Sequence, residues 1–420
     1  MKKFLSVIMA LVLITSALLS FSACNKGDES ALADSLLPIQ EEKADFTVSK
    51  DFKIGFIFLH DENSTYDKNF IDAAKRMKSA LGLTDDQFII KTNIPETSLC
   101  YDAAKDLADQ GCDIIFADSF GHEDFIIQAA KEYPNVQFCH ATGTKAHTEG
   151  VANFHNAFAS IYEGRYLAGM AAGLKLNEMI ESGKITADKA VVGYVGAFTY
   201  AEVKSGFTSF FLGVRSVCPS ATMKVQYTGS WYDEAKEQEA ALALISSGCV
   251  LISQHADSMG APSACEVNNV PNVSYNGATY AACPETFIVS SAINWTPYFM
   301  YIAKCVATGT AIDADWCGGI KEGSVVISGI NTNVAAEGTE DALKTAIAGF
   351  KAGTLKVFDT SKFTVGGKTL TTYLADVDTD PAYAPDTEVI SNGYFHESEY
   401  RSAPCFDLVI DGITELNSAY

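Results

Sequence analysis

The chain has 420 residues, of which 48% are hydrophobic and 20% are charged, and its formal net charge is −22. This length suffices for two domains, or for one large α/β unit, with a sizeable core. The excess of acidic residues argues against nucleic acid and anionic lipid surfaces as binding partners.

The first residues have the pattern of an export signal. Lys2 and Lys3 precede an apolar run over residues 4–21, and Ser22-Ala23-Cys24 follow it. Because the run ends in a cysteine, it resembles the bacterial lipoprotein signal, in which that cysteine is lipidated and becomes the first mature residue. The alternative is a single transmembrane anchor, although the run is short for a crossing of about 20 residues.

We therefore expect residues 1–23 to be a signal peptide and Cys24 to be lipidated. The rest of the chain would then lie on the extracytoplasmic face of the cell membrane. Residues 24–50 are polar and acidic with little periodicity, so with Cys24 they are predicted to form a flexible tether.

The body of the chain contains an internal repeat. The apolar, strand-like run at 53–59 recurs 137 residues later at 190–196, and 111–116 recurs at the same offset at 248–253. Each copy alternates strand-like runs with amphipathic helical patterns. A period this long indicates two domain-sized copies rather than a solenoid, and each copy is predicted to be a doubly wound parallel sheet.

This architecture predicts where a ligand would bind. Ligands of open α/β sheets bind outside the carboxyl ends of the strands, and two facing sheets would enclose a cleft there. The predicted cleft loops are rich in aromatic and hydrogen-bonding side chains, which suit a flat heteroaromatic ring and a ribose. These loops comprise residues 60–69, 93–97, 117–124, 141–145, 197–203, 228–233, 254–259 and 276–279.

Cysteine usage gives little further information. Taking Cys24 as lipidated leaves ten cysteines, none in a C-x-x-C pair and none at zinc-site spacing. We expect few disulfides, and the sequence does not define their pairing. Cys112, Cys139 and Cys249 lie in apolar, strand-like runs and are interpreted as core residues.

Several long, ordered blocks of this sequence resemble the basic membrane protein family of ABC-transporter substrate-binding lipoproteins, which includes purine nucleoside receptors. The blocks fall within about residues 53–310, and a weaker match continues to about residue 412. They read DIIFADSFGHEDFIIQAAKEYPNVQFCHATG, IYEGRYLAGMAAG, GYVGAFTYAEVKSGFTSFFLGVRSVCP, GSWYDEAKEQEAALALISSGCVLISQHADS and NWTPY.

The resemblance implies a type I periplasmic-binding fold, in which two α/β lobes joined by a hinge clamp a ligand, and it implies no cofactor or metal. Carried over by position, Tyr66 or Phe70 would stack on a purine and Asn69 would contact its edge. Relatives often carry Asp at the position of Asn276. Without that carboxylate the contact to a ribose is not implied, so the ligand could also be a free base. The implied ligand-binding residues are Tyr66, Asn69, Phe70, Phe120, Phe198, Trp231, Asp257, Asn276 and Trp295.

The predicted organisation is an N-terminal lobe of residues 51–155 plus about 293–350, a C-terminal lobe of residues 156–292, and a tail of residues 351–420 that completes the lobes. The predicted function is capture of a purine nucleoside or nucleobase and its delivery to an ABC permease in the membrane. Two alternatives stay open, namely a sensor for another small polar ligand such as a sugar or amino acid, and a nucleoside-cleaving enzyme. The chain has no P-loop, G-x-S-x-G or H-E-x-x-H motif, which disfavours the common enzyme classes.

Overall fold

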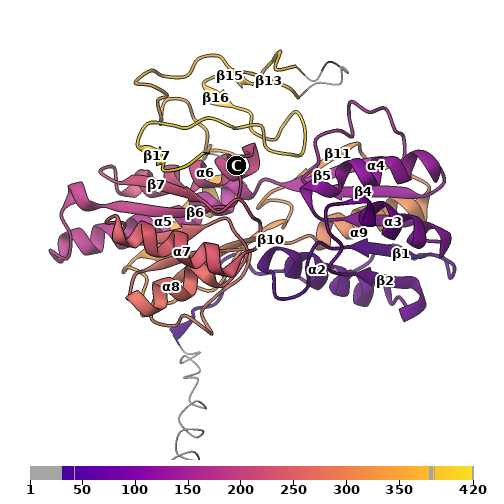
Figure 1. The fold of residues 1–420 in the computed structure, drawn as a ribbon, viewed down its shortest axis with the longest axis horizontal. Coiled ribbons are helices and arrows are strands. Elements are labelled where there is room, and N and C mark those ends of the chain that lie inside the picture. The colour runs from indigo at the N-terminus through magenta and orange to yellow at the C-terminus, as the bar shows by residue number, and fades with distance from the viewer. Residues whose placement is uncertain (1–30, 42, 378–381, 383, 419–420) are drawn as a thin grey trace, which may run out of the picture.

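The computed structural model describes residues 31–41, 43–377, 382 and 384–418. The predicted signal peptide and Cys24 therefore lie outside the described residues. The rest of the chain forms two α/β lobes side by side, with the C-terminal residues layered above them (Figure 1). Within the part of the chain that the structure describes, no helix has the length and apolar character needed to span a bilayer.

The first lobe is built on a six-stranded parallel sheet in the order β11-β5-β4-β3-β1-β2. Helices α3 and α4 pack together on one face of this sheet, and α2 and α9 pack together on the other. The strands are β1 (Ile54–Ile57), β2 (Phe88–Lys91), β3 (Ile114–Ala117), β4 (Gln137–Ala141), β5 (Phe154–Ala159) and β11 (Asp315–Gly318). The helices are α2 (Thr65–Leu81), α3 (Ser98–Asp109), α4 (Glu123–Glu132) and α9 (Thr296–Thr308).

The second lobe is built on a seven-stranded sheet in the order β12-β10-β9-β8-β6-β7-β17, in which only the β10–β12 pair is antiparallel. Its strands are β6 (Val191–Gly196), β7 (Thr222–Tyr227), β8 (Leu251–Gln254), β9 (Asn272–Tyr275), β10 (Phe287–Ile293), β12 (Val325–Ile327) and β17 (Ile413–Glu415). Its helices are α5 (Ile161–Glu181), α6 (Ala201–Val217), α7 (Glu234–Ser246), α8 (Gly260–Asn268) and α10 (Thr339–Lys351).

The internal repeat predicted from the sequence corresponds to the two sheets. The order β2-β1-β3-β4-β5 in the first lobe is repeated as β7-β6-β8-β9-β10 in the second. The four apolar runs that defined the repeat contain β1, β3, β6 and β8, all of which are almost fully buried. The predicted fold class, two doubly wound parallel-sheet lobes, is confirmed.

The two lobes are joined by three crossings of the chain. Residue 160 connects β5 to α5, residues 294–295 connect β10 to α9, and residues 319–324 connect β11 to β12. The domain prediction assigned residues 293–350 to the first lobe, but β12 pairs with β10 and α10 packs against α5. Residues 325–351 therefore belong to the second lobe, because the chain crosses back after β11.

The described part of the predicted tether is also more ordered than expected. Leu32 and Leu37 form isolated β-bridges to Asn331 and Ile327, and the Leu37 side chain is buried against the second lobe. The sequence interpretation underestimated this segment because its few apolar residues are spaced irregularly among polar ones. The buried Leu37 and the half-buried Leu32 nevertheless pack this segment against the second lobe.

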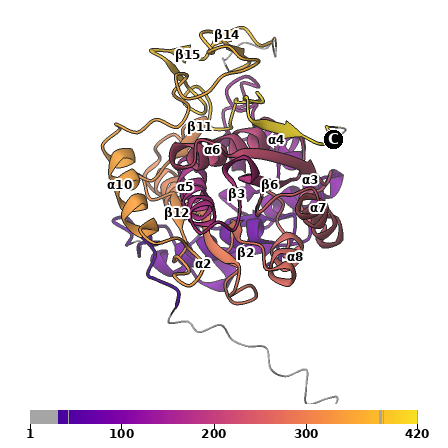
Figure 2. The ribbon, with the colours of Figure 1, turned by 90° about the vertical axis from the view of Figure 1, so that its left-hand side faces the viewer.

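Close packing of α5 on α6 explains glycines on both helices. A Cβ atom on Gly169 would lie 2.0 Å from the backbone oxygen of Phe210, and one on Gly213 would lie 2.1 Å from that of Tyr166. The two helices therefore approach backbone to backbone, and only glycine fits at these positions. Figure 2 shows α5 and α6 with α10 beside them and the C-terminal layer above.

The C-terminal layer consists of short pieces around a small aromatic core. β13 (Leu374–Ala375) pairs with β14 (Thr387–Glu388), and β15 (Ile390–Ser391) pairs with β16 (Tyr394–Phe395). Phe358 stacks on Phe406 with ring centroids 4.8 Å apart, and Phe395 packs edge-on against Phe406. The last strand, β17, extends the second sheet beyond β7.

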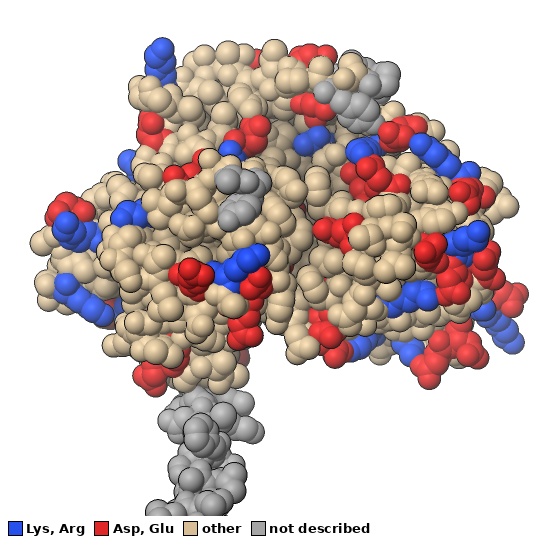
Figure 3. All heavy atoms as spheres, viewed as in Figure 1, with Lys and Arg blue, Asp and Glu red and all other residues tan. Residues whose placement is uncertain are grey.

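The ten cysteines in the described part of the chain are free thiols, and all but Cys317 are buried. Cys112, Cys139 and Cys249 lie in the cores of the two lobes, as expected from their apolar contexts. On the face shown in Figure 3, charged side chains of both signs are scattered over both lobes.

Candidate ligand-binding site

A cavity lies between the lobes at the carboxyl ends of the parallel strands. Its free volume is only about 20 Å³. The lobes are therefore closed tightly on one another. The cavity is lined by Leu59, His60, Tyr66, Asp67, Ser119, Phe120 and Thr142 from the first lobe, and by Glu202, Trp231, His255, Asp257 and Tyr275 from the second.

The first-lobe wall is organised by a buried carboxylate at the start of α2. Asp67 accepts hydrogen bonds from the His60 backbone N at 2.7 Å and from the Ser64 hydroxyl at 2.6 Å. Ser64 is also the N-cap of α2, because its side chain accepts from the Asp67 backbone N. Burial alone would raise the pKa of Asp67, but these hydrogen bonds outweigh burial and the pKa is lowered.

A second carboxyl group, Asp118, lies directly behind this wall. Its side chain accepts from the Leu59 backbone N at 3.1 Å, and its backbone oxygen accepts from the Tyr66 hydroxyl at 2.8 Å. Burial, together with the nearby charge of Asp67, raises the pKa of Asp118 well above its usual range. The pKa values of the two carboxyl groups are thus shifted in opposite directions, and the ring of Tyr66 is held against the cavity.

The second-lobe wall combines aromatic rings with polar groups. The backbone oxygen of Trp231 accepts from the Asp257 backbone N at 3.0 Å, which ties two of the lining loops together. Burial raises the pKa of the Asp257 carboxyl well above its usual range, and the neighbouring charges of Glu237 and Asp67 add to the effect. Burial lowers the pKa of His255, whose Nε2 lies 3.5 Å from Glu202 Oε1.

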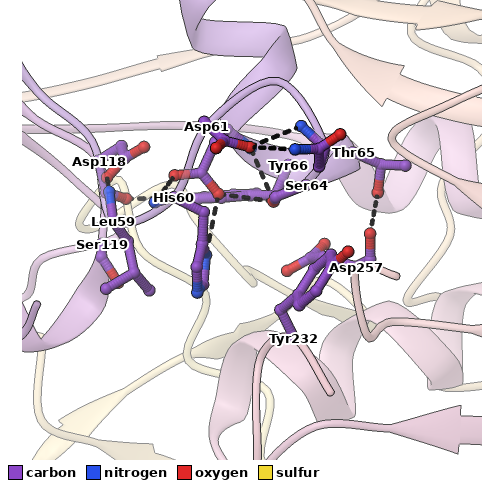
Figure 4. A network of polar contacts seen from close by, with 12 residues as sticks. Leu59, His60, Asp61, Ser64, Thr65, Tyr66, Asp118, Ser119, Tyr232 and Asp257 are labelled. Carbon is purple, nitrogen blue, oxygen red and sulfur yellow. Dashed lines mark hydrogen bonds and ion pairs between the residues drawn. The ribbon is translucent and has the colours of Figure 1, made fainter. Parts of the chain in front are cut away.

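Direct contacts between the lobes keep the cavity closed. The Thr65 backbone N and hydroxyl both donate to the backbone oxygen of Asp257, at 3.2 and 3.0 Å (Figure 4). The side-chain amide of Asn69 donates to the backbone and side-chain oxygens of Asn276, at 3.2 and 3.1 Å. Both bonds join the start of α2 to loops of the second lobe, so they must break when the lobes separate.

A row of aromatic rings also crosses from one lobe to the other. Phe120 of the first lobe contacts Tyr200 of the second with ring centroids 4.9 Å apart. Tyr200 stacks on Phe198 at 5.2 Å, and Phe198 packs edge-on against Trp231 at 5.0 Å. Phe120 and Trp231 line the cavity at the two ends of this row.

The nine predicted ligand-binding residues fall into three groups. Tyr66, Phe120, Trp231 and Asp257 line the cavity. Asn69 and Asn276 bond to each other across the lobes, and Phe198 lies behind Trp231. Phe70 and Trp295 do not line the cavity, because they stack on each other in the first-lobe core with ring centroids 4.4 Å apart.

Several lining residues were not among the predicted ligand-binding residues, namely Leu59, His60, Asp67, Ser119, Thr142, Glu202, His255 and Tyr275. All except Leu59 and Tyr275 lie within the loops that were predicted to line the cleft. Those two stand next to such loops, Tyr275 as the last residue of β9. The position of a loop at a strand end was therefore a stronger signal than the identity of any one residue.

Two lobes that enclose a cavity at facing strand ends form an arrangement suited to binding a small molecule. Residues 59–353 match the Bmp family, described as ABC transporter substrate-binding protein PnrA-like. The chain is 32% identical over 325 residues to a purine-binding protein of Brucella abortus (strain 2308), covering 75% of this chain and 87% of the relative. This chain belongs to the Bmp family of ABC transporter substrate-binding proteins.

Further comparisons agree with this family and fold. A Haloferax volcanii protein, named as the ABC transporter glucose-binding protein TsgA13, is 33% identical over 226 residues, which is 54% of each chain. A solved solute-binding protein from Conexibacter woesei superposes with a TM-score of 0.58 at 20% identity, covering 73% of this chain and 98% of that one. A solute-binding protein from Aeropyrum pernix gives a TM-score of 0.57 at 16% identity, covering 73% and 87%. These structures support the type I periplasmic-binding fold expected from the resemblance.

Membership of this family establishes the general role. The protein is a substrate-binding component of an ABC transporter, so it has a small-molecule ligand, a permease partner and an extracytoplasmic, membrane-associated location. Its relatives in the family are binding proteins rather than enzymes. Within the described ranges, no group of three or more His, Cys, Asp or Glu side chains is arranged to hold a metal ion.

Proposed function

We propose that this protein is a lipid-anchored receptor that captures a purine nucleoside or nucleobase and delivers it to a membrane permease. The observation that carries the proposal is the composition of the cavity, in which aromatic rings from both lobes converge with hydrogen-bonding carboxyl groups. Aromatic faces suit a flat base, and carboxyl groups suit its amino or ribose hydroxyl donors. The relationship to a purine-binding protein over most of its length supports the same ligand class.

In this proposal, the ring of Phe120 from one lobe and the ring of Trp231 from the other pack against the base. Tyr66, fixed by its hydrogen bond to Asp118, lines the end of the space that the base would occupy. Asp257 and Glu202 contact the polar edge or the ribose. Asn69 and Asn276 close the cleft by bonding to each other and contact the ligand once the lobes adjust around it.

The charge of the cavity argues against an anionic ligand. Among the described residues that line it, none is Lys or Arg, whereas Asp67, Glu202 and Asp257 are acidic. A nucleotide would bring its phosphate charges into a site without a compensating cation, which is costly in a buried environment. We therefore expect nucleosides or bases to bind and the corresponding monophosphates to be rejected.

A sugar is the second candidate ligand, and one observation favours it specifically. The relative from Haloferax volcanii carries the name of a glucose-binding protein. Carboxyl groups and a Trp ring also suit a pyranose. The cavity nevertheless presents aromatic rings from both lobes, and rings contributed from both sides favour a flat base over a puckered sugar ring.

The ligand class can be tested by thermal shift followed by calorimetry on the protein produced without residues 1–24. Adenosine, inosine, guanosine, their bases, their 5′-monophosphates, glucose and amino acids would be compared. A ligand that binds the folded state raises the melting temperature by mass action. Stabilisation by nucleosides or bases but not by monophosphates is expected, whereas stabilisation by glucose alone would replace the purine proposal with the sugar one.

The lipid anchor rests on the sequence around Cys24 and needs its own test. The full-length protein and a Cys24→Ala variant would be expressed in a bacterium that processes lipoproteins, and fractionated after labelling with a fatty acid. We expect label on the full-length protein and none on the variant. An unlabelled full-length protein would refute the anchor without affecting the ligand proposal.

A further inference from the structure

The residues that follow the family match form a second connection between the lobes. The match to the Bmp family ends at residue 353, and the chain continues to residue 420. In Figure 1 this C-terminal layer lies mainly above the second lobe and reaches towards the first. Its described contacts show that it is bonded to each lobe by different residues.

The layer is fixed to the second lobe by a strand and a buried side chain. β17 pairs in parallel with β7, and the side chain of Asn417 bonds to both the backbone N and O of Tyr227, at 2.8 and 2.9 Å. Glu397, which is only 2% exposed, accepts a hydrogen bond from the Ser205 hydroxyl on α6. This end of the layer moves with the second lobe.

A different part of the layer is fixed to the first lobe. Asp315, the first residue of β11, accepts from the Ser402 backbone N at 2.8 Å and from the Ser402 hydroxyl at 2.6 Å. The other oxygen of Asp315 lies 2.9 Å from His147 Nδ1, which belongs to a loop of the same lobe. Ser402 is buried, so these charge-assisted bonds are sheltered from water.

The span between the two attachment points is short. Glu397 and Ser402 are five residues apart, which limits their separation to about 17 Å even when fully extended. The span cannot extend freely, because the Cys405 backbone N donates to the Glu397 oxygen at 3.0 Å and closes the loop. A motion that separates Ser205 from Asp315 would therefore have to break the bonds at Ser205, at Asp315 or within this loop.

We propose that residues 397–402 form a brace that limits how far the two lobes open. The three chain crossings act as the hinge, and the brace restrains rotation about them from the side of the C-terminal layer. Binding proteins of this kind exchange ligand by hinge opening, so a brace sets the range between the closed and open states. The proposal concerns the motion alone and does not depend on the identity of the ligand.

The test is a distance measurement between the lobes of the full-length protein without ligand. Spin labels on cysteines introduced at Asp102 in α3 and Glu239 in α7, both exposed, would report the interlobe distance by pulsed electron resonance. Asp315→Ala removes the first-lobe attachment. The matched control is Asp411→Ala, which removes side-chain bonds to Thr364, Gly366 and Gly367, all within the C-terminal layer.

We expect Asp315→Ala to shift the interlobe distance to longer and broader values and Asp411→Ala to leave it at the wild-type value. An unchanged distribution in Asp315→Ala, with a folded circular dichroism spectrum, would overturn the proposal. If Asp315→Ala does not fold, Ser402→Ala removes only the hydroxyl bond and should shift the distance in the same direction by less. An equal shift in the control would also overturn it, because the effect would then come from general loosening of the layer.

Discussion

Removal of the Trp231 ring is the sharpest perturbation of the proposed ligand site. Trp231 is half-buried in the loop that follows β7, and it lines the cavity from the second lobe. Its ring packs edge-on against Phe198 at 5.0 Å and lies 6.0 Å from Tyr200. In Trp231→Ala the backbone oxygen that accepts from Asp257 remains, so the polar frame of the site is preserved.

The expected loss of binding affinity follows from the energy with which one ring face stacks on a base. Stacking of a base on an aromatic side chain is worth about 1–3 kcal/mol when measured by alanine substitution. At about 1.4 kcal/mol per tenfold change in affinity, this range corresponds to roughly 5- to 150-fold weaker binding. Because Phe198 and Tyr200 lose a neighbouring ring as well, the base would also meet a less rigid wall. We therefore expect at least a tenfold increase in Kd.

Calorimetry with adenosine, inosine and guanosine would measure this change, and two variants serve as controls. Trp231→Phe keeps an aromatic face and should retain most of the affinity. Trp316→Ala removes a half-buried Trp from β11, where it packs on Tyr298 at 5.1 Å away from the cavity, and should bind like the wild type. Binding by Trp231→Ala within twofold of the wild type would refute the placement of a base against this ring.

Three further predictions concern the site and the stability of the fold. Asp257→Ala should weaken nucleoside binding at least tenfold in calorimetry, because a buried carboxyl group that meets the ligand is lost; wild-type affinity would exclude that contact. Gly169→Ala should lower the free energy of unfolding by about 1–3 kcal/mol in urea titrations, because its Cβ would overlap α6, whereas Gly349→Ala, with its nearest contact at 3.1 Å, should change it by less. Burial raises the pKa of Glu397 to about 7 from 4.5, so the folded state holds a proton that the unfolded state releases between these values. This group should therefore lower the free energy of unfolding by about 1.4 kcal/mol per pH unit between pH 4.5 and 7. In urea titrations at several pH values, Glu397→Gln should show a shallower decrease of this free energy.

The sequence predicted the sheets well because parallel strands are buried on both faces. The runs at 53–59 and 190–196 are continuous apolar segments for this reason, and their spacing indicated two copies of one architecture. The same architecture placed the cleft loops at the strand ends. Four of the nine predicted residues line the cavity, and all four come from these loops.

Other features depend on spatial relations that local sequence patterns do not contain. Phe70 lies one helical turn beyond the cavity-lining Tyr66, and the apolar pattern of α2 does not distinguish a side chain facing the cavity from one facing the sheet. Its stacking on Trp295, which lies 225 residues later in the chain, places the Phe70 side chain in the core of the first lobe. The return of residues 325–351 to the second lobe likewise follows from a crossing after β11. The C-terminal layer has two-residue strands, which are too short to show periodicity.

The tightness of the cavity bears on how a ligand enters. About 20 Å³ of open space suits one or two water molecules and cannot admit a purine. The bonds from Thr65 to Asp257 and from Asn69 to Asn276 must therefore open before a ligand enters, and the lobes must close around it less tightly than they close on themselves. A self-closed state competes with the ligand, because apparent affinity falls with the fraction of molecules that can accept it. The interlobe bonds and the proposed brace thus act on the same equilibrium, the first by favouring closure and the second by limiting opening.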